Sequence, residues 1–226
     1  AYQLDRLLED VVALIDASGA RTVTLLSHDW GGIVGWFFAL RQVRPLERFI
    51  VMNLPHPRRF ADALKHKSQR KRSRYAAFFQ LPWLPEFLFR MRGAKAIGDA
   101  FYGMAVDKSR FPDEVLDVYR KAALAPGALT AMLNWYRANL FEGTFDLDFP
   151  VLETPTLMVW GEEDAALGVE MTDRTDELVR DFTLRRIPNV SHWVQQEAPE
   201  AVNEIVVAWL TGQPVPEYPD YKGETS

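Results

Sequence analysis

The chain has 226 residues, of which 48% are hydrophobic and 25% charged, a composition typical of a globular domain. Its net charge of −5 gives no reason to expect a nucleic-acid partner, and the absence of cysteine excludes disulfides, thiol nucleophiles and thiolate metal sites. No apolar run reaches the roughly 18–20 residues that cross a bilayer. The lack of cysteine fits a reducing compartment, so we expect a cytoplasmic location.

The first predicted element is an amphipathic helix that ends at Ser18-Gly19. The residues of its apolar face are Leu4, Leu7, Leu8, Val11, Val12 and Ile15. The sequence starts inside this helix, without Met and without a preceding strand. We therefore expect the beginning of the domain to lie outside this sequence, together with any signal or anchor.

The next stretch reads strand, tight turn, helix. Residues 22–26 are apolar and rich in β-branched side chains, and residues 33–40 are apolar at helical spacing. Between them, Ser-His-Asp-Trp-Gly-Gly at 27–32 has the small-x-nucleophile-x-small layout of a nucleophile elbow, with Asp29 at its centre. Ser27, Gly31 and Gly32 supply the small neighbours that a close approach of strand and helix requires. Alternatively, Asp29 simply caps the helix.

The remaining pattern predicts an α/β fold with a parallel sheet and a helical insertion. Residues 47–54 form a second buried strand, which completes a β-α-β unit. The later predictions are helices at 113–124 and 128–140, a strand at 156–160, a helix over 173–179, an alternating edge strand at 182–187 and a helix at 199–210. We divide the chain into a core at 1–55 and 149–212, a helical cap at 56–148 and a loose tail at 213–226.

Two further residues could complete a catalytic triad with Asp29. His192 lies just past the last strand, and Asp164 follows the preceding strand in Gly-Glu-Glu-Asp. Ligands of open α/β sheets gather at the carboxyl ends of the strands. The order nucleophile, acid, base is that of the α/β-hydrolase triad. By contrast, we expect His28 and His56 to have structural roles and His66 to be solvated.

These motifs resemble the α/β-hydrolase-fold epoxide hydrolases, and most closely the subgroup with the animal epoxide hydrolase 4-like proteins. The resemblance extends to about Leu210. The matching segments are residues 27–32, 53–57, 75–86, 126–128, 134–137, 161–164 and 191–197. It implies a partial α/β-hydrolase fold in which the helical cap roofs the active site.

The resemblance also implies a reaction. Tyr75 and Tyr136 match the two cap tyrosines that bind an epoxide oxygen, Asp29 would form a covalent ester, and His192 with Asp164 would activate water to hydrolyse that ester. The Trp30 amide would supply an oxyanion donor. We expect the substrate to be a small apolar epoxide, with water as co-substrate and neither a cofactor nor a metal. The candidate pocket walls are Trp30, Phe78, Trp83 and Trp135, for each of which core packing is an alternative.

The chain departs from the family in one motif. It has no His-Gly-x-Pro loop, which supplies the second oxyanion donor in the family. We therefore expect the 226 residues alone to have an exposed sheet edge and to be weakly stable and inactive.

Three alternative functions remain open. A haloalkane dehalogenase has the same Asp nucleophile, but it does not need Tyr75 and Tyr136. A non-catalytic binding protein could keep the fold, although the intact triad argues against it. Finally, the basic run at 58–74 could contact an anionic membrane, although a solvated cap face is favoured.

Overall fold

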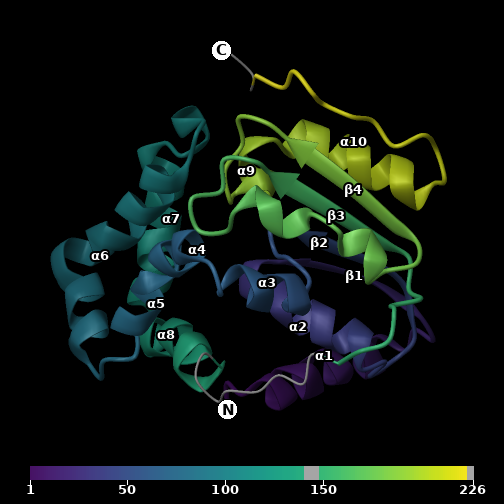
Figure 1. Ribbon diagram of the computed structural model, residues 1–226. Coiled ribbons are helices and arrows are strands. Elements are labelled where there is room, and N and C mark those ends of the chain that lie inside the picture. Colours follow the sequence, from purple (N-terminus) through teal and green to yellow (C-terminus); the bar gives the residue numbers. More distant parts are fainter. Residues whose placement is uncertain (140–147, 223–226) are drawn as a thin grey trace.

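The computed structural model describes residues 1–139 and 148–222, and its centre is a four-stranded parallel sheet (Figure 1). The strands are β1 (Val23–His28), β2 (Leu46–Met52), β3 (Thr156–Gly161) and β4 (Phe182–Ile187), in the spatial order β1-β2-β3-β4. All three pairings are parallel. The predicted α/β fold with a parallel sheet is therefore confirmed.

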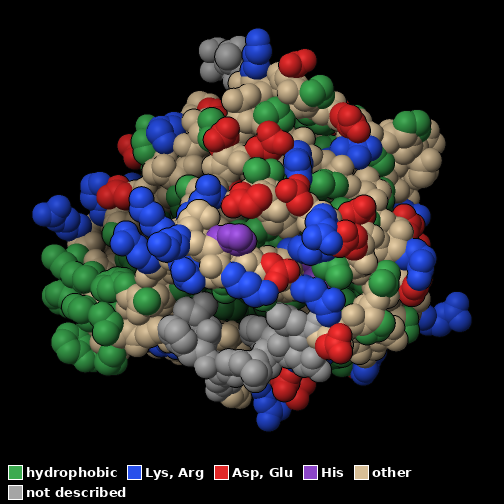
Figure 2. All heavy atoms as spheres, viewed as in Figure 1, with side chains coloured by type: hydrophobic (Ala, Val, Ile, Leu, Met, Phe, Trp, Pro, Cys, Tyr) green, Lys and Arg blue, Asp and Glu red, His purple; other side chains and the backbone are tan. Residues whose placement is uncertain are grey.

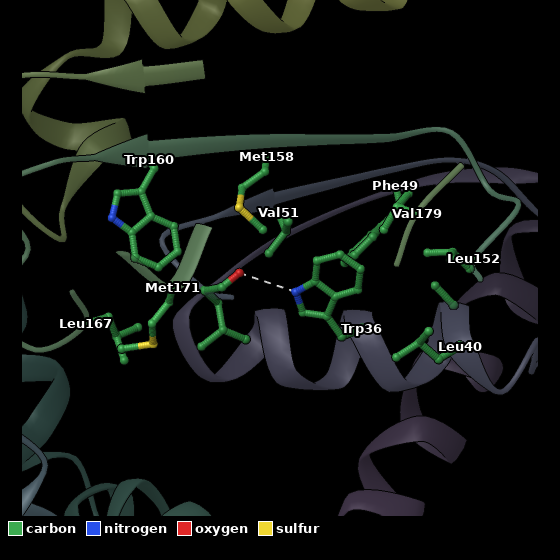
Figure 3. Close-up of a cluster of buried hydrophobic side chains, with 12 residues drawn as sticks. Trp36, Leu40, Phe49, Val51, Leu152, Met158, Trp160, Leu167, Met171 and Val179 are labelled. Atoms are coloured by element: carbon green, nitrogen blue, oxygen red, sulfur yellow. Dashed lines mark hydrogen bonds between the residues drawn. The ribbon is translucent and has the colours of Figure 1, made fainter. Parts of the chain in front are cut away.

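Helices cover both faces of the sheet, which explains why its strands are apolar at successive positions. On one face, Phe49 and Val51 of β2 pack with Trp36 of α2 (Asp29–Leu40) (Figure 3). Trp36 also donates a hydrogen bond to the Leu54 carbonyl. On the other face, Ile50 packs with Ile205 of α10 (Pro199–Leu210).

The first helix, α1 (Leu4–Ser18), packs its predicted apolar face against α2. Leu4, Leu7 and Leu8 are buried in one cluster with residues of α2. Asn139 accepts a hydrogen bond from the Leu4 amide and donates one to the Tyr2 carbonyl. The side chain of Asn139 therefore connects the helix that ends at this residue to the start of α1.

The described elements between β2 and β3 are all helical, as expected for the cap, and those after residue 63 form a layer beside the sheet (Figure 1). The elements are α3 (Pro57–Ala63), α4 (Lys67–Arg72), α5 (Arg74–Phe78), α6 (Leu84–Met104), η1 (Lys108–Arg110), α7 (Asp113–Leu124) and α8 (Ala128–Asn139). Phe60 and Ala63 of α3 instead pack against the core cluster that contains Trp36. Helix α6 is kinked, with non-helical backbone from Met91 to Ala94. Residues 140–147 of the predicted cap, including the predicted end of α8, lie outside the described residues. The boundaries between core and cap stay a prediction.

The predicted helix over 173–179 is wrong. The segment holds only the short 3₁₀ turns η2 (Val169–Thr172) and η3 (Thr175–Glu177), because Asp173 is extended and Arg174 is left-handed. The backbone then pairs in extended form, with a bridge between Leu152 and Val179. This pairing competes with a continuous helix and ends it.

The strand predicted at 182–187 is confirmed as the edge strand β4. Its expected alternation in burial is corrected, because β4 is half-buried from Phe182 to Arg186 and buried at Ile187. The chain after α9 (Val194–Glu197) and α10 returns to this part of the sheet. Arg185 donates hydrogen bonds to the carbonyls of Val215 and Pro216. The described part of the tail, 213–222, is thus anchored rather than loose, while 223–226 lie outside the described residues. Within the described ranges, no helix combines the length and apolarity needed to cross a membrane.

Candidate active site

The site begins at the turn between β1 and α2. Asp29 has a φ of 50°, a value uncommon for a residue with a side chain, in agreement with the strained turn expected of an elbow. Strand and helix approach closely there. A Cβ added at Gly35 would lie 2.8 Å from Ser27 Oγ, and one at Gly32 would lie 2.9 Å from Leu54. Gly31 faces open space, so the expected need for a small residue holds for Gly32 but is wrong for Gly31. Gly35, which was not predicted, has the same need.

The structure brings the three predicted triad residues together at the carboxyl ends of the strands. His192 Nδ1 lies 2.7 Å from Asp164 Oδ2, and His192 Nε2 lies 3.5 Å from Asp29 Oδ1. The side chains of His192 and Asp164 are buried, whereas 41% of the Asp29 side chain is exposed. A small molecule can therefore reach the Asp29 carboxylate, while the other two residues are held behind it.

The electrostatics of this cluster favour charged forms. Burial by itself lowers the pKa of His192, but hydrogen bonds and charges from Asp164 and Asp29 raise it to about 10. Burial tends to raise the pKa of Asp29, yet the hydrogen bond and charge of His192 outweigh it and lower that pKa. At neutral pH an imidazolium therefore lies between two carboxylates, and Asp29 is ionised.

Asn53, whose importance the sequence did not reveal, holds the acid in place. It directly follows β2, is fully buried, and has a φ of 39°. Its amide donates to Asp164 Oδ2 at 2.9 Å, and its oxygen accepts from the Gly161 amide at 2.9 Å. Asp164 Oδ1 accepts from the amides of Ala166 and Leu167 at 2.8 and 2.9 Å. The position of Asn53 after a strand was the available signal.

The two predicted tyrosines meet on the cap side of the site. Tyr75 of α5 and Tyr136 of α8 have ring centroids 6.0 Å apart, and their side chains interact by a hydrogen bond. Burial, together with the charge of Asp29, raises the pKa of Tyr75 to about 12. Burial and the neighbouring Tyr75 and Asp29 raise the pKa of Tyr136 further. Both phenols therefore keep their protons at neutral pH and can donate them.

Aromatic residues surround the tyrosines. The Trp30 ring lies 4.9 Å from that of Tyr136 and 6.1 Å from that of Trp135, and a hydrogen bond links the Trp30 and Tyr136 side chains. Phe79, which was not predicted, contacts both tyrosines, with centroid distances of 5.4 Å to Tyr75 and 4.9 Å to Tyr136.

The other two predicted wall residues lie differently. Phe78 is half-buried and contacts Phe79 at 6.1 Å, so it is one ring removed from the tyrosines. Trp83 is 73% exposed, which corrects the expectation that it lines the pocket. It has a φ of 51° just before the first turn of α6, and this backbone turn directs most of the side chain to solvent.

The remaining histidines have the structural positions expected of them. His28 Nε2 donates to the His192 carbonyl at 2.9 Å, and the two rings are 4.7 Å apart. Burial and the charge of His192 lower the pKa of His28, so it is neutral beside the imidazolium. His56 is buried and accepts from the Arg58 amide at the start of α3, and His66 is exposed.

The loop that carries His192 is fastened to the cap through a buried carboxylate that the sequence did not single out. Glu197 accepts from the amides of Val106 and Asp107 at 3.0 and 2.9 Å, and from the Ser191 hydroxyl. Next to His192, Trp193 stacks on Phe101 of α6 at 4.3 Å. These contacts therefore fix the position of the His192 loop relative to the cap. In the part of the chain that the structure describes, no group of three or more His, Asp or Glu residues could hold a metal ion.

Comparison with known proteins places this arrangement in a family. The model of the alpha/beta hydrolase family matches residues 1–205. The chain is 36% identical to epoxide hydrolase 4 of Homo sapiens, covering 92% of this chain and 59% of that protein. It is 40% identical to epoxide hydrolase 3 of Xenopus tropicalis, covering 92% and 58%.

A solved structure gives the same result. A crystal structure of a Bacillus megaterium epoxide hydrolase with an inhibitor superposes with a TM-score of 0.84 at 28% identity, covering 93% of this chain and 76% of the other. The chain spans less than two thirds of the length of the two curated relatives. The family model, the shared fold and the strand-end triad lead to one conclusion: the chain belongs to the alpha/beta hydrolase family.

Proposed function

We propose that the protein is an epoxide hydrolase that converts small apolar epoxides into vicinal diols through an ester on Asp29. The observation that carries the proposal is the pair of protonated phenols, Tyr75 and Tyr136, whose ring centroids are 6.0 Å apart and whose pKa values are raised by burial and, to a smaller extent, by the nearby charge of Asp29. Two proton donors near enough to a carboxylate nucleophile to be influenced by its charge suit a substrate whose leaving group is an alkoxide oxygen. The similarity to proteins named epoxide hydrolase supports the same chemistry.

The first step is ring opening. An Asp29 oxygen forms a bond to one epoxide carbon while the bond from that carbon to the ring oxygen breaks. The ring oxygen leaves with the electron pair and takes a proton from Tyr75 or Tyr136. The phenolate so formed regains a proton from the imidazolium of His192, relayed through water. Because the ester carries no charge, the Asp29 contribution to the raised pKa of His192 disappears, which favours this transfer.

The second step is hydrolysis of the ester. Neutral His192, held by Asp164 at 2.7 Å, removes a proton from a water whose oxygen attacks the ester carbonyl. The amide of Trp30, which hydrogen-bonds the Asp29 carboxylate, stabilises the oxyanion of the tetrahedral intermediate. Its collapse expels the diol oxygen, which takes the proton left on the attacking oxygen. Asp29 returns as a carboxylate beside a protonated His192.

We expect the catalytic rate of the 226 residues by themselves to be low. They contain no His-Gly-x-Pro sequence, so Trp30 is the one oxyanion donor that we assign. Because loss of one such donor costs about 10²–10³ in rate, we expect residues 1–226 by themselves to turn over epoxides very slowly. Rapid turnover by a soluble monomer of these residues would contradict this part of the proposal. A cytoplasmic location likewise stays a prediction, based on the absence of cysteine.

The test traps the intermediate. In the naturally expressed form of the protein, His192→Gln should stop hydrolysis but not ring opening. Incubation with an aryl or alkyl epoxide should then add the mass of the epoxide to the peptide that contains Asp29, as read by mass spectrometry. The matched control, Asp29→Asn with His192→Gln, should show no adduct. Absence of an adduct on Asp29, or an adduct formed with haloalkanes only, would overturn the proposal, and the latter would favour a dehalogenase.

A further inference from the structure

The cap carries a strongly basic segment on a chain that is acidic overall. Residues 65–98 contain nine Lys or Arg and one acidic residue, Glu86, although the net charge of the chain is −5. Glu86 is itself neutralised by a two-pronged ion pair with Arg137, at 2.5 and 2.9 Å. The segment therefore presents almost purely positive charge.

Most of these cations have no ion-pair partner. Lys65 pairs with Asp62 and Lys95 with Asp99. Arg72 donates a hydrogen bond to the Asp164 carbonyl at 3.2 Å. The remaining six are exposed and form no ion pair with any residue in the described ranges 1–139 and 148–222; they are Lys67, Arg70, Lys71, Arg74, Arg90 and Arg92. These like charges repel one another, and no carboxylate neutralises them. Their repulsion destabilises the folded protein unless an anionic partner is present.

The same segment exposes large apolar side chains. Trp83 and Phe87 are 73% and 60% exposed, and together with Leu81, Leu88 and Met91 they form what we call the apolar tip. In Figure 2 a hydrophobic area at the left edge, at the place of α6 in Figure 1, lies beside blue Lys and Arg side chains at the place of α4. Exposed apolar clusters of this kind usually mark an interaction surface.

We propose that the apolar tip and the six unpaired cations form a face that binds the surface of an anionic phospholipid bilayer. A bilayer interface accepts apolar and aromatic side chains at headgroup depth and attracts Lys and Arg to its phosphates. Trp, with an apolar ring and an N–H donor, is enriched at such interfaces. The charges of the face are of one sign and unpaired, as this partner requires. From the sequence alone, the basic run was better explained as a solvated face, and the exposure of the apolar tip is the new observation.

Membrane binding by this face does not depend on the proposed catalytic activity, but it would affect how a substrate reaches the candidate active site. Tyr75 lies in the same segment, between the cations of α4 and the apolar tip, and is itself 43% exposed. The face therefore borders the candidate active site. An apolar substrate dissolved in the bilayer would reach the site close to where the protein contacts the lipid.

The experiment measures co-sedimentation of the purified protein with two kinds of vesicle. The anionic probe is phosphatidylcholine with 30% phosphatidylserine, and the neutral comparison is phosphatidylcholine alone. We expect binding to the anionic vesicles only, and loss of binding in high salt. Arg70→Glu, Lys71→Glu and Arg74→Glu together should weaken partitioning by about tenfold or more. The matched control reverses three exposed charges outside the segment, Arg21→Glu, Lys121→Glu and Lys222→Glu, with the same net change in charge.

Two further variants test the apolar tip. Phe87→Ser should weaken binding several-fold, whereas Trp83→Phe should keep binding and lose the blue shift of tryptophan fluorescence on anionic vesicles. Equal binding by the two triple variants, or no binding to anionic vesicles by the unmodified protein, would overturn the proposal. So would a concentration-dependent dimer that Phe87→Ser abolishes, because a second copy would then cover the face.

Discussion

The amide of Asn53 donates a 2.9 Å hydrogen bond to Asp164 Oδ2, the same oxygen that lies 2.7 Å from His192 Nδ1. A single carboxylate oxygen is thus shared between a fixed donor and the candidate base. The shared bond sets the direction in which Asp164 presents its charge, and so the orientation of the imidazole.

Removal of this donor should slow hydrolysis of the ester more than its formation. Asn53→Ala loses a hydrogen bond to a charged group, of a kind worth about 1.5–3 kcal/mol, so we expect the hydrolysis step to slow by about 10- to 100-fold. Ring opening needs Asp29 and the tyrosines and should change little. Single-turnover kinetics should therefore show accumulation of the covalent adduct. A variant that merely misfolds would lose both steps together, which is the contrary outcome.

The tyrosines should act on ring opening. Tyr75→Phe and Tyr136→Phe each remove one donor to the epoxide oxygen, and we expect the rate of adduct formation to fall by about 10²-fold for each. The double variant should lose measurable turnover. It should still fold, also when it is combined with His192→Gln to measure adduct formation. Tyr102→Phe is the matched control, since Tyr102 is also 43% exposed on the cap but lies on α6 against Lys108. Equal losses in all three single variants would contradict the assignment.

The raised pKa of His192 predicts how stability depends on pH. Its pKa rises from 6.5 in the unfolded chain to about 10 in the folded protein, so the folded state binds the proton more tightly. The stabilisation is fully present below pH 6.5 and is lost as the pH rises toward 10. The difference in free energy of unfolding between the unmodified protein and His192→Gln should therefore shrink across that range. Urea unfolding at several pH values measures it, and a difference that grows with pH would refute the sign.

The contact between the acid loop and the His192 loop depends on Gly161. A Cβ added there would lie 2.2 Å from the Ser191 carbonyl oxygen and 2.7 Å from that of Val190. Both neighbours are backbone atoms, so Gly161→Ala must displace the loop, at a cost of about 1–3 kcal/mol or more. Gly103→Ala, on the exposed side of α6 with no atom within 4 Å, is the control and should be neutral or stabilising by up to about 1 kcal/mol. Thermal unfolding and turnover of both variants provide the comparison.

Much of the fold could be predicted because its signals are local. The alternation of apolar strands with helical spacing identified β1, α2, β2, β3 and α10, and parallel strands place their carboxyl ends along one edge. This rule was enough to predict that Asp29, Asp164 and His192 would meet. Where long-range pairing competes with local preference, prediction failed, as it did at 173–179, where the Leu152–Val179 bridge replaces a helix.

From the sequence alone, residue types and their order along the chain determined the elements and the candidate nucleophile, acid and base, and the family resemblance added the two phenols. Only the tertiary structure showed that Asn53 and Glu197 hold the loops, that Phe79 contacts both tyrosines and that Trp83 faces solvent. The physical reason is distance along the chain. A bond such as that between Asn53 and Asp164 joins residues 111 positions apart, and no local pattern records which buried polar groups will satisfy one another.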